Sequence, residues 1–191
     1  MNRYTFINRH FVSAFVVLGL IAIGGMPLQA TASKASKQEK EIKEAHAALA
    51  EFEKKDPSLK EFFGTAYGYA VFPKVGKGGL IVGGAHGKGV VYKKQQVVGF
   101  ASISQATIGA EIGGQTFKEL IFFENEPVYQ SFTKNAATLA AQATAVVAKS
   151  GSAANAKYNK GVAIFVTGQE GLMLEAAVGG QSFSFKPAKV N

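Results

Sequence analysis

The sequence predicts an α+β fold, in which N-terminal helices pack on a curved, glycine-rich antiparallel β-sheet that is barrel- or sandwich-like. A charged stretch with helical periodicity comes first, over residues 34–63, and short apolar segments rich in β-forming side chains follow over residues 64–187. Thirteen of the 22 glycines fall between Gly64 and Gly114. Because glycine inside a strand permits bulges and sharp coiling, this spacing favours a strongly curved sheet.

The length and composition favour one domain with its own core, which we expect to span residues 31–191. The chain has 191 residues, of which 47% are hydrophobic, and this content excludes general disorder. It contains no cysteine, which excludes disulfide bonds and lipid attachment through a cysteine. The core alone must therefore hold the fold together.

The first thirty residues have the pattern of a secretory signal peptide. Arg3 and Arg9 flank the start of a thirteen-residue run of apolar and small residues at positions 11–23, and small residues then offer cleavage after Ala30 or Ala32. The alternative is a single membrane anchor, but the run is short for the ~20 residues that a spanning helix needs. We therefore expect residues 1–30 to be removed and the protein to be exported, either periplasmic or secreted, with a peripheral position on a membrane as one option.

Removal of that segment leaves a basic mature protein. The chain has 21 Lys and Arg against 13 Asp and Glu, and without Arg3 and Arg9 the count is 19 against 13, a net charge of +6. A basic surface suits anionic partners such as lipid headgroups, polyanions or cell-wall polymers. We do not expect nucleic acid as a partner, because the sequence has no long cluster of Lys or Arg.

The N-terminal part of the mature chain predicts two helices. Residues 33–55 carry a narrow apolar stripe at helical spacing, and the other faces hold charges of both signs. Ser36 and Glu39 have capping-box spacing at its start. Asp56 and Pro57 then predict an N-cap and first position of a second helix that runs to about Phe63. The stripe consists of Ile42, Ala45, Leu49 and Phe52.

Short strands, one further helix and an ambiguous segment are expected after Gly64. Asn125, Glu126 and Pro127 predict a helix that runs to Phe132 or Thr133. Residues 136–149 favour a helix by their alanines and a strand by their Thr and Val, so both remain open, and residues 151–160 predict a loop. The expected strands are residues 67–73, 79–82, 90–92, 97–104, 107–112, 115–124, 162–167, 172–178 and 181–185.

Three segments resemble the SYLF domain family. They are the run Gly68-Tyr-Ala-Val-Phe-Pro-Lys-Val-Gly-Lys-Gly-Gly-Leu-Ile-Val-Gly-Gly-Ala-His-Gly-Lys-Gly-Val90, the run Ile108-Gly-Ala-Glu-Ile-Gly-Gly-Gln115 and the run Gly161-Val-Ala-Ile-Phe165. The resemblance covers roughly residues 37–186. It implies lipid recognition, because eukaryotic SYLF proteins bind membrane lipids, notably phosphoinositides, and some yeast members also bind actin. Basic residues and the amphipathic N-terminal helix are the site candidates that it implies.

Lysines within and just after the glycine-rich tract are the candidates for contact with a lipid headgroup. Glycine-flanked lysines at turns can present ammonium groups and open backbone amides to a phosphate. An ordinary role as solvated turn lysines is equally open. A nucleotide site is not expected, because the tract from Gly83 to Gly89 is one residue short of a phosphate loop and lacks Ser or Thr after its lysine. The candidates are Lys74, Lys77, Lys88, Lys93 and Lys94.

Catalytic and metal chemistry have little support in the sequence. His46 is expected on an exposed helix face and His86 in a turn, and two separated histidines make neither a zinc site nor a hydrolase pair. Glu111 and Glu175 interrupt apolar strands and form a hydrolase couple only if they lie within several ångströms of each other. We expect no catalytic residue, metal or cofactor. Five aromatic residues, expected first in the core, deserve a test of their exposure: Tyr67, Tyr69, Phe122, Phe123 and Tyr129.

The sequence therefore predicts a non-enzymatic protein that binds anionic membrane lipid. The alternative is a structural or envelope-stress protein that binds protein or cell-wall partners through the stripe of its N-terminal helix. A weaker alternative is a carboxylate-dependent hydrolase. The oligomeric state does not follow from the sequence.

Overall fold

A computed structural model describes residues 28–79, 82–108, 111–134, 145–168 and 181–188. The helices are α1 (Leu28–Lys55), α2 (Leu59–Thr65), α3 (Glu126–Lys134) and the short 3-10 helix η2 (Ala153–Asn155). The strands are β1 (Gly68–Gly79), β2 (Val82–Lys93), β3 (Gln96–Ile108), β4 (Glu111–Phe123), β5 (Ala145–Val147), β6 (Val162–Thr167) and β7 (Gln181–Pro187). The predicted strand at residues 172–178 lies outside the described residues.

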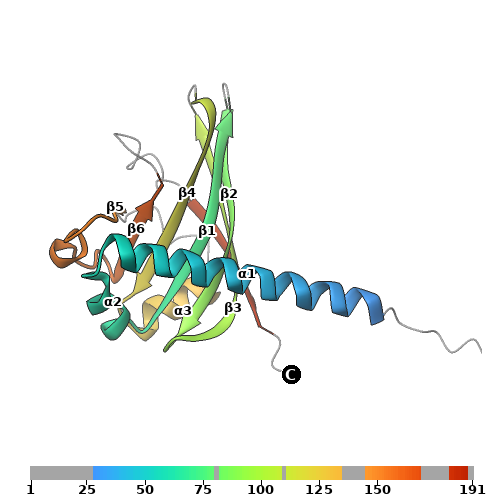
Figure 1. The fold of residues 1–191 in the computed structure, drawn as a ribbon, viewed down its shortest axis with the longest axis horizontal. Helices are drawn as coiled ribbons and strands as arrows, with labels where there is room; N and C mark the ends of the chain where they lie inside the picture. The colour runs from blue at the N-terminus through green and yellow to red at the C-terminus, as the bar shows by residue number, and fades with distance from the viewer. Residues whose placement is uncertain (1–27, 80–81, 109–110, 135–144, 169–180, 189–191) are drawn as a thin grey trace, which may run out of the picture.

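The strands form one sheet, and the predicted α+β class is confirmed. In the described residues, the sheet has seven strands in the order β5-β6-β4-β1-β2-β3-β7 (Figure 1). Neighbouring strands are antiparallel except for β5 and β6, which are parallel, so the expectation of a purely antiparallel sheet is wrong at this edge. β5 and β7 form the two edges, and in the described part of the chain the sheet is therefore open and not a closed barrel.

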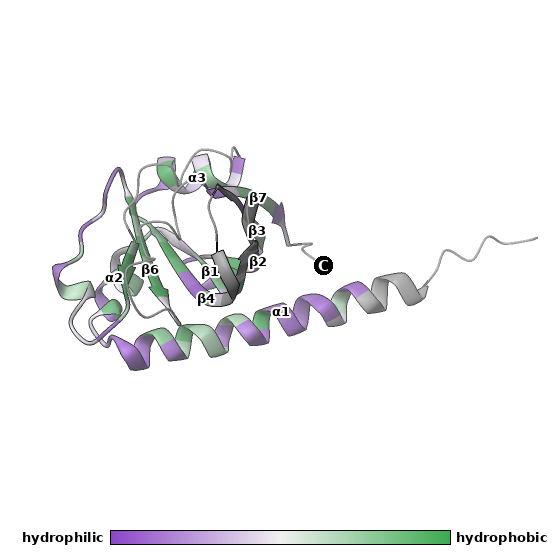
Figure 2. Ribbon diagram, turned by 90° about the horizontal axis from the view of Figure 1, so that it is seen from above, coloured by the Kyte–Doolittle hydropathy of each residue, from purple (hydrophilic) through white to green (hydrophobic). Residues whose placement is uncertain are grey.

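The open sheet is nevertheless strongly curved. Figure 2 shows the strands curling so that α3 lies across the open side of the curl, while α1 runs along the outer face. The side-chain amide of Gln181 on β7 donates a hydrogen bond of 3.0 Å to Glu119 on β4, although three strands separate β7 from β4 in the sheet. The curl thus brings side chains from the inner face of distant strands into contact.

Two apolar layers, one on each face of the sheet, build the core. On β1, Ala70 and Phe72 belong to the inner layer with Phe132 of α3, whereas Tyr69 and Val71 belong to the outer layer with α1 and α2. This alternation follows from the two-residue side-chain period of a strand. Both faces of the central strands are therefore buried between helices.

The central strands are longer than the sequence predicts. We expected short strands in this region, but β1 to β4 each have twelve or thirteen residues and contain many of its glycines. Of the expected strands at residues 79–82 and 107–112, the structure describes only the ends of long strands, where Gly79 ends β1, Val82 begins β2, Ile108 ends β3 and Glu111 begins β4. Residues 80–81 and 109–110 lie outside the described residues. The segment at residues 136–149 contains β5 at positions 145–147, which decides for a strand there; residues 136–144 lie outside the described residues.

Of the first two predicted helix caps, one is wrong and the other differs in where the helix begins. α1 begins at Leu28, so Ser36 and Glu39 lie inside the helix and form no capping box at its start. α2 begins at Leu59 with Ser58 as its N-cap, two residues after the predicted start at Pro57. The predicted capping contact is nevertheless present, because the Ser58 amide donates a hydrogen bond of 3.1 Å to the Asp56 carboxylate. The carboxylate also accepts hydrogen bonds from the backbone amides of Gly151 at 3.1 Å and Ala153 at 2.7 Å. Asp56 therefore ties the α1–α2 junction to the loop around η2.

The third predicted helix is confirmed at α3. The Asn125 side chain accepts a hydrogen bond of 3.2 Å from the amide of Val128, which is the expected capping contact. The proposed cleavage points after Ala30 and Ala32 fall in the first turns of α1, and export remains a prediction. Among the described helices, none combines the length and the apolar character that crossing a bilayer requires.

Glycines flanking Lys88 allow β2 to approach β1 closely at an irregularity of β1 between Val71 and Lys74. A Cβ atom at Gly89 would lie 2.6 Å from the Val71 carbonyl oxygen and 2.6 Å from Cδ1 of Phe72. Real Cβ atoms do not approach backbone so closely, so a side chain at this position requires the two strands to separate. Gly89 thus serves strand packing, in agreement with the predicted role of the glycines in sheet shape.

The substitution Gly89→Ala is expected to destabilise the fold by roughly 1–3 kcal/mol, because it overpacks a buried strand pair. Gly64→Ala is the matched control, since a Cβ there has no atom within 4 Å. In helix α2 this control is expected to stabilise by ~0.5–1 kcal/mol. Denaturant unfolding of both variants tests the prediction, and equal midpoints for the two variants would contradict it.

Candidate functional site

The structure brings two of the five candidate lysines together. Lys74 on β1 and Lys88 on β2 are cross-strand partners, so both side chains lie on the outer face of the sheet and both are exposed. Lys93 ends β2, five residues beyond Lys88, and Lys94 is in the turn that follows. The backbone of Lys77 lies in β1 opposite Ala85, but its side chain is outside the described residues. The described residues therefore do not form a single cluster of all five lysines.

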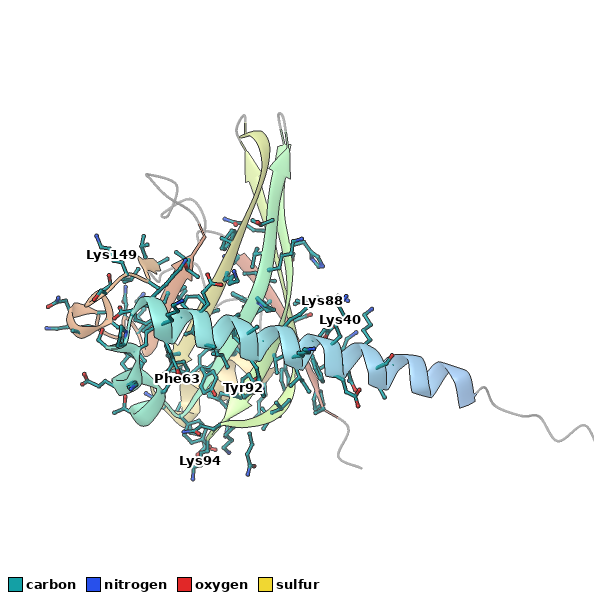
Figure 3. The ribbon with its side chains drawn as sticks, in the orientation of Figure 1. Lys40, Phe63, Lys88, Tyr92, Lys94 and Lys149 are labelled. Atoms are coloured by element: carbon teal, nitrogen blue, oxygen red, sulfur yellow. The ribbon has the colours of Figure 1, made fainter. Side chains whose placement is uncertain are left out.

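A groove of about 200 Å³ adjoins Lys88, where α1 crosses the β1–β2 hairpin. Figure 3 shows Lys40 reaching from α1 and Lys88 from β2 on the same side of the molecule. Sequence reasoning missed the helix residues, because only the crossing of α1 over β2 brings them to the lysine of the strand. We call this site the lysine groove, and its lining residues are Lys37, Lys40, Glu41, Glu44, Pro73, Lys88, Gly89 and Val90.

Like charges meet in the lysine groove. The Lys88 side chain lowers the pKa of Lys37, first through a close side-chain contact and then through its positive charge. The negative charge of Glu41 opposes part of this effect. Glu41 also forms an ion pair of 3.6 Å with Lys88, while Lys40 pairs with Glu44 at 3.8 Å along the helix. Two ammonium groups at one groove favour a bound anion between them. The groove is therefore suited to a phosphate or another oxyanion.

A polar row continues from Lys88 across the outer face of the sheet. Lys88 pairs with Ser102 of β3, which in turn pairs with Ser184 of β7, and the two serine hydroxyl oxygens lie 2.6 Å apart. His86 lies on the same face, opposite Ser104. It is exposed within β2, so the expected turn position of His86 is wrong. The outer face next to the groove thus offers hydroxyl and imidazole groups to a ligand.

The apolar stripe of α1 packs on the sheet of the same chain. Ala45 and Phe52 are fully buried in the outer layer, and Ile42 and Leu49 are partly buried against it. Ala48, which sequence reasoning missed, is buried with them. The free energy of burying this stripe therefore stabilises the domain. A partner or a bilayer would have to separate α1 from the sheet to reach these side chains.

His46 and most of the five aromatic residues lie where the sequence predicts. His46 is exposed on α1. Tyr69, Phe122, Phe123 and Tyr129 are buried and belong to the core. The fifth, Tyr67, is partly buried, and the Lys93 ammonium lies 4.8 Å from the centre of its ring. Lys93 is therefore engaged by Tyr67 at a distance from the lysine groove.

The suggested pair of carboxylates lies only partly within the described residues. Glu111 is described by its backbone, at the start of β4 opposite Gly79, and Glu175 lies outside the described residues. The structure instead reveals Glu119, a fully buried carboxyl on the inner face of β4. Burial raises the pKa of Glu119 to about 8, against the smaller opposing effect of the Gln181 hydrogen bond. In the described residues, no group of three or more His, Cys, Asp or Glu side chains is arranged to hold a metal ion.

The chain is similar to a protein named beta cell expansion factor A from Aeromonas veronii. The two sequences are 32% identical over 140 residues, which is 73% of this chain and 53% of the relative. The chain thus spans about half the length of the curated relative that it matches. A scan against models of known protein families finds no match.

Proposed function

We propose that this protein is a SYLF-type module that binds anionic membrane lipid without enzymatic activity, and that the lysine groove contacts the headgroup. The observation that carries the proposal is the approach of Lys37 on α1 to Lys88 on β2, which places two ammonium groups at one groove. The resemblance of residues 68–90 to the SYLF family supports the same function. A lipid phosphate between the two ammonium groups would relieve their repulsion.

Lys74 extends the positive charge beyond the groove. It is the cross-strand partner of Lys88, and like charges in directly opposite positions destabilise a sheet unless an anion screens them. Each lysine near an anionic membrane surface contributes about 1 kcal/mol to binding. Glu41 and Glu44 neutralise part of this charge through their ion pairs with Lys88 and Lys40. We place this contact in the exported, membrane-peripheral setting that the N-terminal pattern predicts.

The triple variant Lys37→Gln, Lys74→Gln and Lys88→Gln is expected to bind vesicles that contain phosphatidylglycerol about 10- to 100-fold more weakly, given ~1 kcal/mol for each lysine. Co-sedimentation measures the partition coefficient at a fixed, low salt concentration. Far-UV circular dichroism verifies that the variant is folded.

The matched control is Lys54→Gln, Lys60→Gln and Lys149→Gln, which removes the same charge from exposed positions outside the groove. It is expected to retain most of the binding. An equal loss of binding in both variants would mean that general surface charge, and not the lysine groove, causes binding, which would contradict the proposed site. Equal binding of the wild-type protein to neutral and anionic vesicles would refute the proposal as a whole.

A further inference from the structure

A second cavity, which shares no residue with the lysine groove, opens beside α2. It has a volume of about 360 Å³, within the range of small-molecule sites. α2 contributes Glu61, Phe62 and Thr65 to its wall, and Glu124 follows directly after the end of β4. The remaining wall is formed by three alanines in and next to η2 and by Lys157 and Tyr158.

Two aromatic rings line this cavity in a fixed arrangement. The centres of the Phe62 and Tyr158 rings lie 5.2 Å apart, and the ring planes are inclined by 57°. Phe62 also packs against two core residues, with its ring centre 5.3 Å from that of Phe122 and 5.1 Å from that of Phe165. A cation near such rings is attracted by their negative faces, most strongly where water is excluded.

The polar groups of the cavity are mostly acceptors. The Tyr158 hydroxyl oxygen is buried, and the Thr65 hydroxyl lies near it without the distance and angle of a formed hydrogen bond. Burial raises the pKa of Tyr158 to about 12, and the negative charge of Glu124 adds to the effect of burial while the neighbouring Thr65 hydroxyl opposes it. Glu124 and Tyr158 line the same cavity. With Glu61, the cavity has two carboxylates against the single ammonium of Lys157.

We propose that this cavity binds a small organic ammonium ion. The aromatic rings would contact its alkyl groups and its positive charge, Glu124 would neutralise that charge, and the Tyr158 hydroxyl would pair with a polar group on the ligand. An anionic ligand is disfavoured by the two carboxylates. A neutral apolar ligand would desolvate the same carboxylates without any compensating charge. The site is independent of headgroup binding at the lysine groove.

Choline is the probe, and 3,3-dimethylbutan-1-ol, which replaces its nitrogen with carbon, is the neutral control. In titrations of the labelled full chain followed by NMR, choline is expected to shift the backbone amide signals of residues 153–158 in a saturable manner. The alcohol is expected to produce no saturable shift. Glu124→Gln is expected to weaken choline binding at least tenfold, whereas Glu39→Gln, an exposed acid on α1 outside both sites, leaves it unchanged.

Equal binding of choline and the alcohol would overturn the proposal, as would the absence of a saturable shift or an unchanged affinity of the Glu124→Gln variant. The amide spectrum and thermal unfolding verify that this variant keeps the fold. A second arm uses phosphatidylcholine vesicles to identify the source of the ammonium group. Binding of free choline alone indicates a free amine, and Glu124-dependent binding of both indicates a lipid headgroup.

Discussion

Replacing Asp56 with alanine is expected to destabilise the protein by about 3–5 kcal/mol, because the change leaves buried amides without their partner. The Asp56 side chain is fully buried and accepts hydrogen bonds from the amides of Ser58, Gly151 and Ala153. Hydrogen bonds to a charged acceptor contribute about 1.5–3 kcal/mol each. The bonds from Gly151 and Ala153 join segments that lie 95 and 97 residues apart in the sequence.

The pH dependence of this effect has a definite sign. Burial alone would raise the pKa of Asp56, but the hydrogen bonds from Ser58, Ala153 and Gly151 outweigh it, and the pKa lies below its usual value. The contribution is therefore complete above the unfolded-state pKa of ~3.9 and disappears as the pH falls through the lower folded-state pKa. The destabilisation in Asp56→Ala should accordingly be full at pH 7 and shrink in strong acid.

Denaturant unfolding at pH 7 and at pH 3 tests both statements. Asp56→Asn keeps one acceptor oxygen, so its stability is expected to lie between those of the wild-type protein and Asp56→Ala. This variant provides the measurement if the alanine variant fails to fold. Glu53→Gln removes an exposed charge from the same part of α1 and should change the midpoint little. A stability of Asp56→Asn equal to that of the wild-type protein at pH 7 would contradict the role of the carboxylate.

Glu119→Gln is expected to stabilise the protein above pH 5 and to remove most of its loss of stability between pH 5 and pH 8. Glu119 is fully buried, one carboxyl oxygen accepts from Gln181, and the other has no hydrogen-bond partner in the described residues. Because burial raises its pKa to about 8, the folded state holds a proton that the unfolded state, with a pKa of ~4.3, has already released. Stability therefore falls as the pH rises from about 4 to about 8.

The size of the effect follows from the pKa difference, at ~1.4 kcal/mol for each unit of pH. The wild-type protein should lose roughly 3–5 kcal/mol across this window, whereas glutamine, which resembles the protonated acid in shape and has no charge, loses none from this position. Unfolding midpoints at pH 4.5, 6 and 8 measure the two profiles. Glu61→Gln, at an exposed position, is the control and should leave the wild-type profile unchanged. Parallel profiles for the wild-type protein and Glu119→Gln would contradict the prediction.

The sequence predicted the helical and strand segments better than their ends. A short run of β-forming side chains identified β6 at its actual bounds, and Asn125 with Pro127 identified α3, because these signals act within a few residues. The ends of β1 to β4 were missed, since glycine normally weakens a strand and the sequence does not show where a neighbouring backbone needs its small size. Gly89 is such a position, where the contact comes from β1.

The sequence predicted only part of the candidate site, for a related reason. Lys74 and Lys88 could be selected from the glycine-rich tract, and their pairing follows from the hairpin register. Lys37 and Lys40 look like ordinary solvated charges of a helix, and only the crossing of α1 over β2 places them at the groove. Lys93 was selected by the same rule as Lys88 but lies against Tyr67.

The sequence by itself determined the α+β class, the order of helices and sheet, the apolar stripe of α1 and the basic character of the chain. These properties depend on side-chain periodicity and composition, which are local or additive. Only the tertiary structure decided that the stripe is covered by the chain's own sheet, that Asp56 binds a distant loop, and that Glu119 is buried with a raised pKa. Each of these depends on contacts between residues far apart in the sequence, and burial and charge proximity arise only when the chain folds.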